Sequence, residues 1–450
     1  MSDQVDPQSP APLDPPDASD PSTLGALPPS DPAPSRMRDR SWFSGLPREV
    51  AVLSSVAFCV ALGFGIVAPA IPIFAQEFHV SAFWASSVIS AFALMRLVGA
   101  LPAGWLVDRT GERTTLIVGL TIVAVSSAFA GFSTSFVQLV VLRGIGGLGS
   151  AMFTVSALAL LLRVAAPEQR GRAAAVWQGG FLLGGIVGPF FGGLVLGISI
   201  RLPFFVYAAT LGAAVVVVIT LLAKTQLGEK PDSASAVKDE PVPGWQLLRR
   251  ALRNRAYVTA LAVNLGNGFT AFGLRSAIVP LFVVNGLGLD KVWAGYGAFA
   301  SALTQGPLLG PAGRTTDTRG RRIALMLGIG ISATGFVALA LTGATWGYMA
   351  AMAILGAGSA FLGAAPAAVV GDVTEGRREG PVVAAFQMMS DVGAVVGPLV
   401  AGLIVDRTGS FEAAFLVGAG VLLVTFLLAA TMPETLRRPT DEATADATGR

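Results

Sequence analysis

Apolar residues in this 450-residue chain form long continuous runs that short polar segments separate. Twelve runs fit between residues 49 and 432, each near the about 20 residues that an α-helix needs to cross a hydrocarbon core of about 30 Å. The expected spans are 49–75, 82–106, 114–133, 135–162, 171–197, 203–223, 256–284, 292–312, 323–343, 346–370, 382–405 and 411–432. The pattern predicts an all-α membrane protein with twelve transmembrane helices.

Composition supports this prediction. Hydrophobic residues make up 53% of the chain and charged residues 13%, where a soluble chain has about 25%. Glycine is abundant, at 54 residues, and small residues allow membrane helices to approach closely. The single cysteine, Cys59, excludes an intrachain disulfide.

A short polar stretch occurs twice, 209 residues apart, each time between two apolar runs. The first copy contains Gly104, Asp108, Arg109, Gly111 and Arg113, and the second contains Gly313, Asp317, Gly320 and Arg322. A repeat of this length predicts two copies of a half-protein, with a tight loop between membrane helices at the same place in each copy.

The first copy reads Gly-x-Leu-x-Asp-Arg-x-Gly-x-Arg, which resembles the loop signature of the major facilitator superfamily. The resemblance covers nearly the whole chain and implies two pseudo-symmetric six-helix halves, 49–223 and 256–432. Residues 224–255 are expected to form a cytoplasmic linker. Residues 1–48, which are rich in proline and aspartate, and 433–450 are expected to be cytoplasmic tails, the first of them disordered.

The loop also suggests a switching role. Asp108 is expected to lie beside the start of the eleventh helix, whose N-terminus carries a partial positive charge, and Asp317 beside the start of the fifth. The glycines permit the tight turn, and Arg113 and Arg322 neutralise the cluster or bind lipid headgroups. The second copy is degenerate, because Thr318 replaces the arginine of the first.

Positive charges predict the orientation. Of the 31 lysines and arginines, 25 fall on the side of the two tails and three in the opposite loops. This bias places both termini in the cytoplasm, with the protein in a plasma membrane. Arginine outnumbers lysine 27 to 4, which hints at a bacterial source.

The fifth span carries a row of small residues, repeated 209 positions later in the eleventh. Its members are Gly184, Gly188, Pro189, Gly192 and Gly193. The row could be ordinary packing glycine with a kinking proline. Its Gly-Pro pair and glycine pair resemble the antiporter motif of drug:proton exchangers, as Leu62-Gly63 with Pro69 and Pro72 resembles a signature of their twelve-helix branch. The resemblance implies a face that slides against its neighbour.

Four ionisable residues lie well inside predicted spans: Arg96, Arg143, Arg275 and Asp391. Intramembrane charges are costly and usually functional. Arg143 resembles the family arginine of the fourth helix, although it could instead hold the bundle through backbone carbonyls. Matching depth predicts an Arg96–Asp391 pair that closes the cytoplasmic side; Arg275 is the rival partner for Asp391.

Aromatic and amide side chains could line a substrate cavity, although such residues often only pack. The candidates are Phe64, Trp177, Gln178, Asn264, Asn267, Phe272, Gln305 and Gln387.

Together these features predict a secondary transporter, not an enzyme, that exports drugs or hydrophobic metabolites in exchange for protons. A proton-coupled importer of a sugar or organic acid is the alternative, although Lys224-Thr-Gln-Leu stands where a sugar-porter signature is expected. A non-transporting membrane sensor is a third possibility. The expected partners are a small-molecule substrate, protons and the lipid bilayer, without nucleic acid, metal or a cofactor other than the proton gradient. The chain is expected to act as a monomer.

Overall fold

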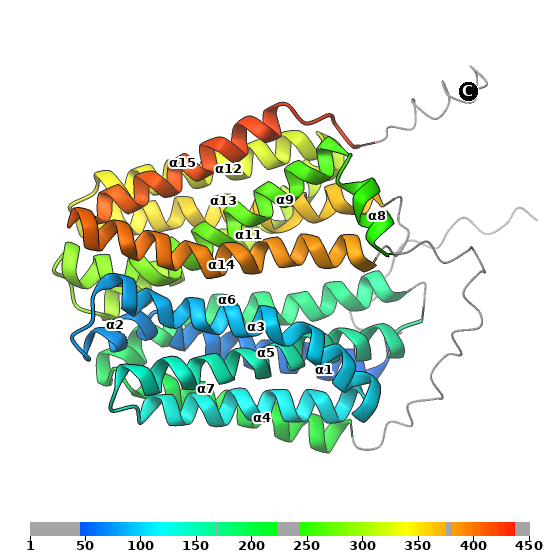
Figure 1. The fold of residues 1–450 in the computed structure, drawn as a ribbon, viewed down its shortest axis with the longest axis horizontal. Helices are drawn as coiled ribbons and strands as arrows, with labels where there is room; N and C mark the ends of the chain where they lie inside the picture. Colours follow the sequence, from blue (N-terminus) through cyan, green and yellow to red (C-terminus); the bar gives the residue numbers. More distant parts are fainter. Residues whose placement is uncertain (1–45, 167–168, 223–243, 375–379, 437–450) are drawn as a thin grey trace, which may run out of the picture. The chain divides into compact units, whose positions relative to one another are not determined.

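The computed structural model describes residues 46–166, 169–222, 244–374 and 380–436, and every long element in these ranges is a helix (Figure 1). The first helices are α1 (Arg48–Val67), α2 (Ala70–Gln76), α3 (Ala82–Thr110), α4 (Glu112–Gly131), α5 (Phe136–Val164), α6 (Arg170–Ile198) and α7 (Leu202–Leu221). The others are α8 (Gly244–Ala251), α9 (Arg255–Gly268), η4 (Phe269–Ile278), α10 (Val279–Leu281), η5 (Phe282–Gly286), α11 (Val292–Thr318), α12 (Arg321–Leu341), α13 (Thr345–Val373), α14 (Gly380–Thr408) and α15 (Phe411–Ala430).

The predicted all-α membrane fold is confirmed. Within the described ranges, 11 helical segments are long and apolar enough to cross a membrane. The remaining long helix, α11, has 27 residues but is less apolar, because it contains Gln305 and two prolines. Helices satisfy their own backbone hydrogen bonds, which is why they can span a membrane that offers no water.

Three local features differ from the predicted spans. The first span is divided into α1 and α2, which meet next to Pro69. The seventh is α-helical only in part, because η4 and η5 are π-helical. The short helix α8 lies inside the segment expected to be a linker. The expected tails and most of that linker lie outside the described residues.

Helices pack mainly within two groups. In the first, α1 lies along α6 and α7, and α5 lies along α3 and α4; in the second, α13 lies along α11 and α12, and α14 lies along α9 and η4. The main contacts between the groups are α3 with α14 and α6 with α11. We call the groups the first and second half, the end where α3 ends and α4 begins the motif end, and the opposite end the far end.

The repeated loop has the same backbone geometry in both copies. Gly111, between α3 and α4, has φ 84°, and Gly320, between α11 and α12, has φ 118°. Side chains with a Cβ rarely adopt these values, so the turn needs glycine at both places.

The small residues of α6 pack mainly on α1. A Cβ added to Gly188 would lie 2.6 Å from the Leu62 carbonyl oxygen, and Cβ atoms added to Gly184 and Gly192 would lie 2.4 Å and 3.0 Å from the α1 backbone. Within the predicted row Gly193 reaches the second half, at Val292 and Tyr296 of α11, and Gly197 further along α6 also meets Val292. The expected sliding face is therefore, for most of its length, a tight contact inside one half.

This contact predicts a stability difference between neighbouring glycines. Gly188→Ala should lower the free energy of unfolding by about 1–3 kcal/mol, because the new methyl group meets α1 backbone that cannot move aside. Gly185→Ala is the matched control on the same helix, since a Cβ there meets nothing within 4 Å. Thermal unfolding of the two purified variants in detergent tests this; equal midpoints would contradict it.

Candidate functional site: the interface between the two halves

At the far end, a carboxylate of the second half caps a helix of the first. Asp406 of α14 accepts hydrogen bonds from the Ser81 hydroxyl at 2.5 Å and from the backbone N–H groups of Ala82 at 2.9 Å and Phe83 at 3.1 Å. The first N–H groups of a helix have no partner within it, and a carboxylate there satisfies both them and the helix dipole. The bonds tie the start of α3 to the end of α14.

Further along the same two helices the structure joins the predicted ion pair. The Ser90 hydroxyl donates to the Val395 carbonyl at 2.7 Å, and the Arg96 guanidinium then contacts the Asp391 carboxylate. The two side chains are 28% and 12% exposed. Matching depth in the membrane thus identified Arg96 correctly as the partner of Asp391. Arg275, the alternative partner, forms its hydrogen bonds elsewhere.

Glycines make the closest approach between the halves. Gly193 of α6 lies against the Val292 backbone of α11, and Gly402 of α14 lies against the backbone of Ala82 and Phe83 of α3. Gly402 follows Gly193 by 209 residues, and Val292 follows Phe83 by the same number. The two crossings are therefore copies of one contact.

Toward the motif end several positions of α3 and α11 are exposed. A Cβ at Gly104 of α3, or at Gly310 or Gly313 of α11, would meet nothing within 4 Å, and the side chains of Leu101 and Leu303 are 85% and 54% exposed. Within the described residues, the hydrogen bonds and the ion pair between the halves lie between the far end and Arg96–Asp391. The role of this pair in closing the cytoplasmic side stays a prediction.

The sequence profile of the Major Facilitator Superfamily matches residues 53–304 and 261–449. The chain belongs to this superfamily. It is therefore a membrane transporter rather than an enzyme.

Individual relatives are more distant. The transporter is 23% identical to an uncharacterized MFS-type transporter of Methanocaldococcus jannaschii over 84% of this chain and 97% of that one. It is 34% identical to a multidrug efflux protein of Bacillus subtilis, but over only 40% of this chain and 44% of that one. The crystal structure of a bacterial homolog of the human lysosomal transporter Spinster, in an inward-facing and unoccupied conformation, matches with a TM-score of 0.71 at 16% identity, over 89% of this chain and 100% of that one.

Arg143 of the transporter is buried in the first half. Its side chain is 2% exposed and its guanidinium lies over the Phe92 ring, 4.7 Å from the centroid. Its Nε has no hydrogen-bond partner among the described residues. The alternative that backbone carbonyls hold this arginine has no support among the described contacts.

Three of the eight residues expected to line a cavity pack within a half instead. The Phe64 ring meets Tyr207, and the buried Trp177 ring meets Phe181. Asn264 donates from Nδ2 to the Phe386 carbonyl of α14 at 2.6 Å.

The remaining candidates differ in exposure. Gln178 and Gln387 are exposed, and Phe272 and Gln305 are half-buried. Asn267 lines a cavity inside the second half, together with Arg275.

The loop motif makes contacts that the sequence did not predict. Asp317 pairs with Arg321 at 3.3 Å, and the start of α6 has no side-chain cap among the described residues, so the expected Asp317 cap is not formed. Arg113 donates to the Ile219 carbonyl at 3.2 Å, and Arg109 lies over the Trp105 ring. Asp108 is exposed at the end of α3, and the segment before α14 lies outside the described residues.

One ion pair at the motif end occurs in both halves with its charges exchanged. In the first half Arg163 of α5 bonds Glu112 of α4 at 2.9 Å. In the second, Arg321 of α12 bonds Asp372 of α13, also at 2.9 Å. Arg321 and Asp372 follow Glu112 and Arg163 by 209 residues. Comparing charges at that offset would have revealed both pairs from the sequence.

The segment after α15 completes the motif end of the second half. Glu434 accepts from the backbone N–H groups of Arg321 at 2.8 Å and Arg322 at 3.2 Å, and Thr435 donates to Asp372 at 2.8 Å. The Pro433-Glu434-Thr435 stretch therefore caps α12.

The Arg96–Asp391 contact predicts non-additive mutations. Arg96→Ala or Asp391→Asn alone should destabilise the protein by about 3–5 kcal/mol, because each leaves one charge unpaired in an apolar site. The double variant should lose less than the sum of the two. Thermal unfolding of the three variants in detergent measures this, and strictly additive losses would show that the pair carries no coupling energy.

The exchanged charges of the two ion pairs predict that reversing both charges of one pair restores the stability lost by reversing one of them. Glu112→Arg should destabilise the first half by placing two arginines together, and adding Arg163→Glu should restore most of the loss. The restored order, arginine before acid, is the one that the second half already uses. Protein yield and thermal stability of the single and double variants test the prediction; no recovery in the double variant would mean that the surroundings fix the polarity.

Proposed function

We propose that the transporter exports hydrophobic small molecules, such as drugs or hydrophobic metabolites, in exchange for protons. Similarity to multidrug efflux proteins supports export, although those alignments cover only about half of each chain. The resemblance of the small-residue motif in α6 to that of the drug:proton exchangers also favours export.

The Arg96–Asp391 bridge is the observation that carries the coupling proposal. Asp391 joins the two halves through a charge that a proton can remove. Once Asp391 is protonated, the ion pair loses its attraction, and α3 and α14 can separate. Proton binding would thereby favour one conformation over the other, which is the requirement for coupling.

The contacts suggest how access alternates. In the conformation described, the Asp406 cap and the glycine crossings hold the far end together while the motif end opens. Reversal needs those far-end bonds to break and the motif end to close, as rocking of one half against the other would do. With the tails in the cytoplasm, as the distribution of arginine and lysine favours, this is the state open to the cytoplasm.

The remaining assignments belong to the same proposal. The proton gradient is the only energy source, no cofactor is required, and the protein works as a monomer in the plasma membrane.

Transport in liposomes tests the proposal. Purified protein is reconstituted with an internal pH dye and offered lipophilic drugs, antibiotics or sugars. We expect drug that enters the liposomes to drive protons out of them, because an antiporter moves the two in opposite directions through one site. Sugar-driven proton uptake would replace the proposal with import.

One pair of variants isolates the coupling residue. Asp391→Asn should abolish proton movement, because the carboxylate that pairs with Arg96 between the halves is then gone. Asp290→Asn is the control, since this acid is exposed in a far-end loop. Full proton coupling in Asp391→Asn would disprove the role of Asp391 while leaving export itself open to the drug assay.

A further inference from the structure

Charges inside the described membrane helices do not balance. Asp391 is engaged by Arg96, and neither Arg143 nor Arg275 has an ion pair within the described ranges. Each charge costs about 2.5–3.5 kcal/mol at the centre of a membrane helix on insertion scales, so two unpaired arginines need an explanation. Arg143 faces an aromatic ring, whereas Arg275 faces a polar cavity.

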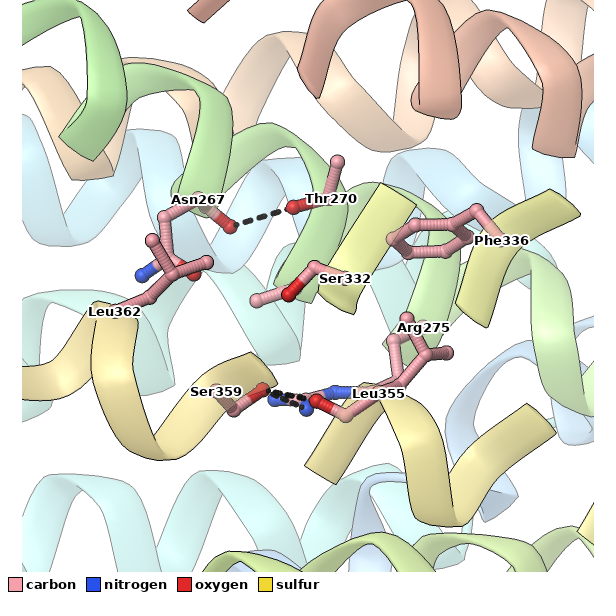
Figure 2. A pocket seen from close by; sticks show the side chains of 9 residues that line it. Asn267, Thr270, Arg275, Ser332, Phe336, Leu355, Ser359 and Leu362 are labelled. Atoms are coloured by element: carbon pink, nitrogen blue, oxygen red, sulfur yellow. Dashed lines mark hydrogen bonds between the residues drawn. The ribbon is translucent and has the colours of Figure 1, made fainter. Parts of the chain in front are cut away.

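Arg275 is only partly bonded. It lies in the π-helical segment η4, and its Nη1 donates to the Ser359 hydroxyl at 2.8 Å and, at 3.5 Å, to that of Ser301. Figure 2 shows the guanidinium beside Ser359 in the cavity. A guanidinium has five N–H donors. Those of Nε and Nη2 have no acceptor among the described residues. π-Helical turns are often found at functional sites.

The cavity around Arg275 offers more unused donors. It is lined by Asn267 and Thr270 at the start of η4, by Ser332 of α12 and by Ser359 of α13. Ser332 is 4% exposed, yet neither its hydroxyl nor the Asn267 amide forms a hydrogen bond with any described residue. Both groups can therefore donate to a particle in the cavity.

The rest of the lining is apolar, formed by Ala271, Phe336, Leu355 and Leu362. The cavity has a volume of about 10 Å³, which is room for about one water-sized particle. A cation would be repelled by Arg275, and a water molecule would leave its charge uncompensated. A single small anion would satisfy the donors and the charge together.

We propose that the Arg275 cavity binds one small monovalent anion. Arg275 supplies the charge through Nε and Nη2, and Ser332 and Asn267 supply neutral donors. The anion is either free chloride or the carboxylate end of a transported molecule, and the second source rests on the export function proposed above. Either one would join η4 to α12, so the occupied cavity would hold these helices together.

Anion-dependent melting of the purified protein tests the site without requiring transport. The protein is unfolded in detergent at constant sodium concentration while gluconate, which is too bulky for the cavity, is replaced by chloride or by formate. We expect a saturable rise in the melting temperature with at least one of the small anions. Chloride alone would identify the inorganic ion, whereas formate would identify carboxylate recognition.

Variants locate the effect. Arg275→Gln should abolish the anion dependence, and Ser332→Ala, which keeps the charge, should weaken the apparent affinity about tenfold by removing one donor. Thr334→Ala is the matched control, because it removes an exposed hydroxyl from the same helix and should change nothing. If Arg275→Gln does not fold, the difference in anion affinity between Ser332→Ala and Thr334→Ala still tests the site.

The proposal is overturned if the wild type shows no saturable anion effect, or if Ser332→Ala and Thr334→Ala bind the anion equally well. Loss of drug export in the liposome assay with anion binding intact would separate the two proposals.

Discussion

Close backbone contact at glycine is the constraint on which this structure depends. Lipid is as apolar as leucine, so burial of apolar surface does not drive membrane helices together, and dispersion contacts must do so. Gly188 on α1, Gly397 on η4 and Gly193 on α11 bring main chains together where any side chain would keep them apart. The same device builds each half and then joins them. Contacts within each half and contacts between the halves are of the same kind, and they differ only in number.

Polar groups add direction to this packing. The far-end contact relies on Asp406, which stabilises the free N–H groups of α3, and the middle of the interface relies on an ion pair. Both interactions need correct orientation, and each can be lost as a unit. Such interactions favour discrete arrangements of an interface over a continuous range, which suits a protein that must never be open on both sides.

The sequence predicted the helices well because a membrane span leaves a run of about 20 apolar residues. It predicted the Arg96–Asp391 pair because few charges lie that deep, so depth alone leaves little choice. It failed for cavity residues such as Asn264 and Trp177, since helix rotation decides whether a side chain faces a cavity or a neighbour. The π-helical turns of η4 change that rotation, and no residue pattern in 269–278 predicted these turns.

The capping of α12 by Glu434 has a consequence for biogenesis. Helix α12 enters the membrane about a hundred residues before Glu434 is synthesised, since the two residues that it joins, Arg321 and Glu434, are 113 positions apart. Until then two N–H groups of Arg321 and Arg322 have only water as a partner. The second half therefore stays incomplete at its motif end until translation is almost finished. A nascent chain stalled earlier would have formed the local pair of each half, Glu112–Arg163 and Arg321–Asp372, but would still expose the start of α12 to proteases.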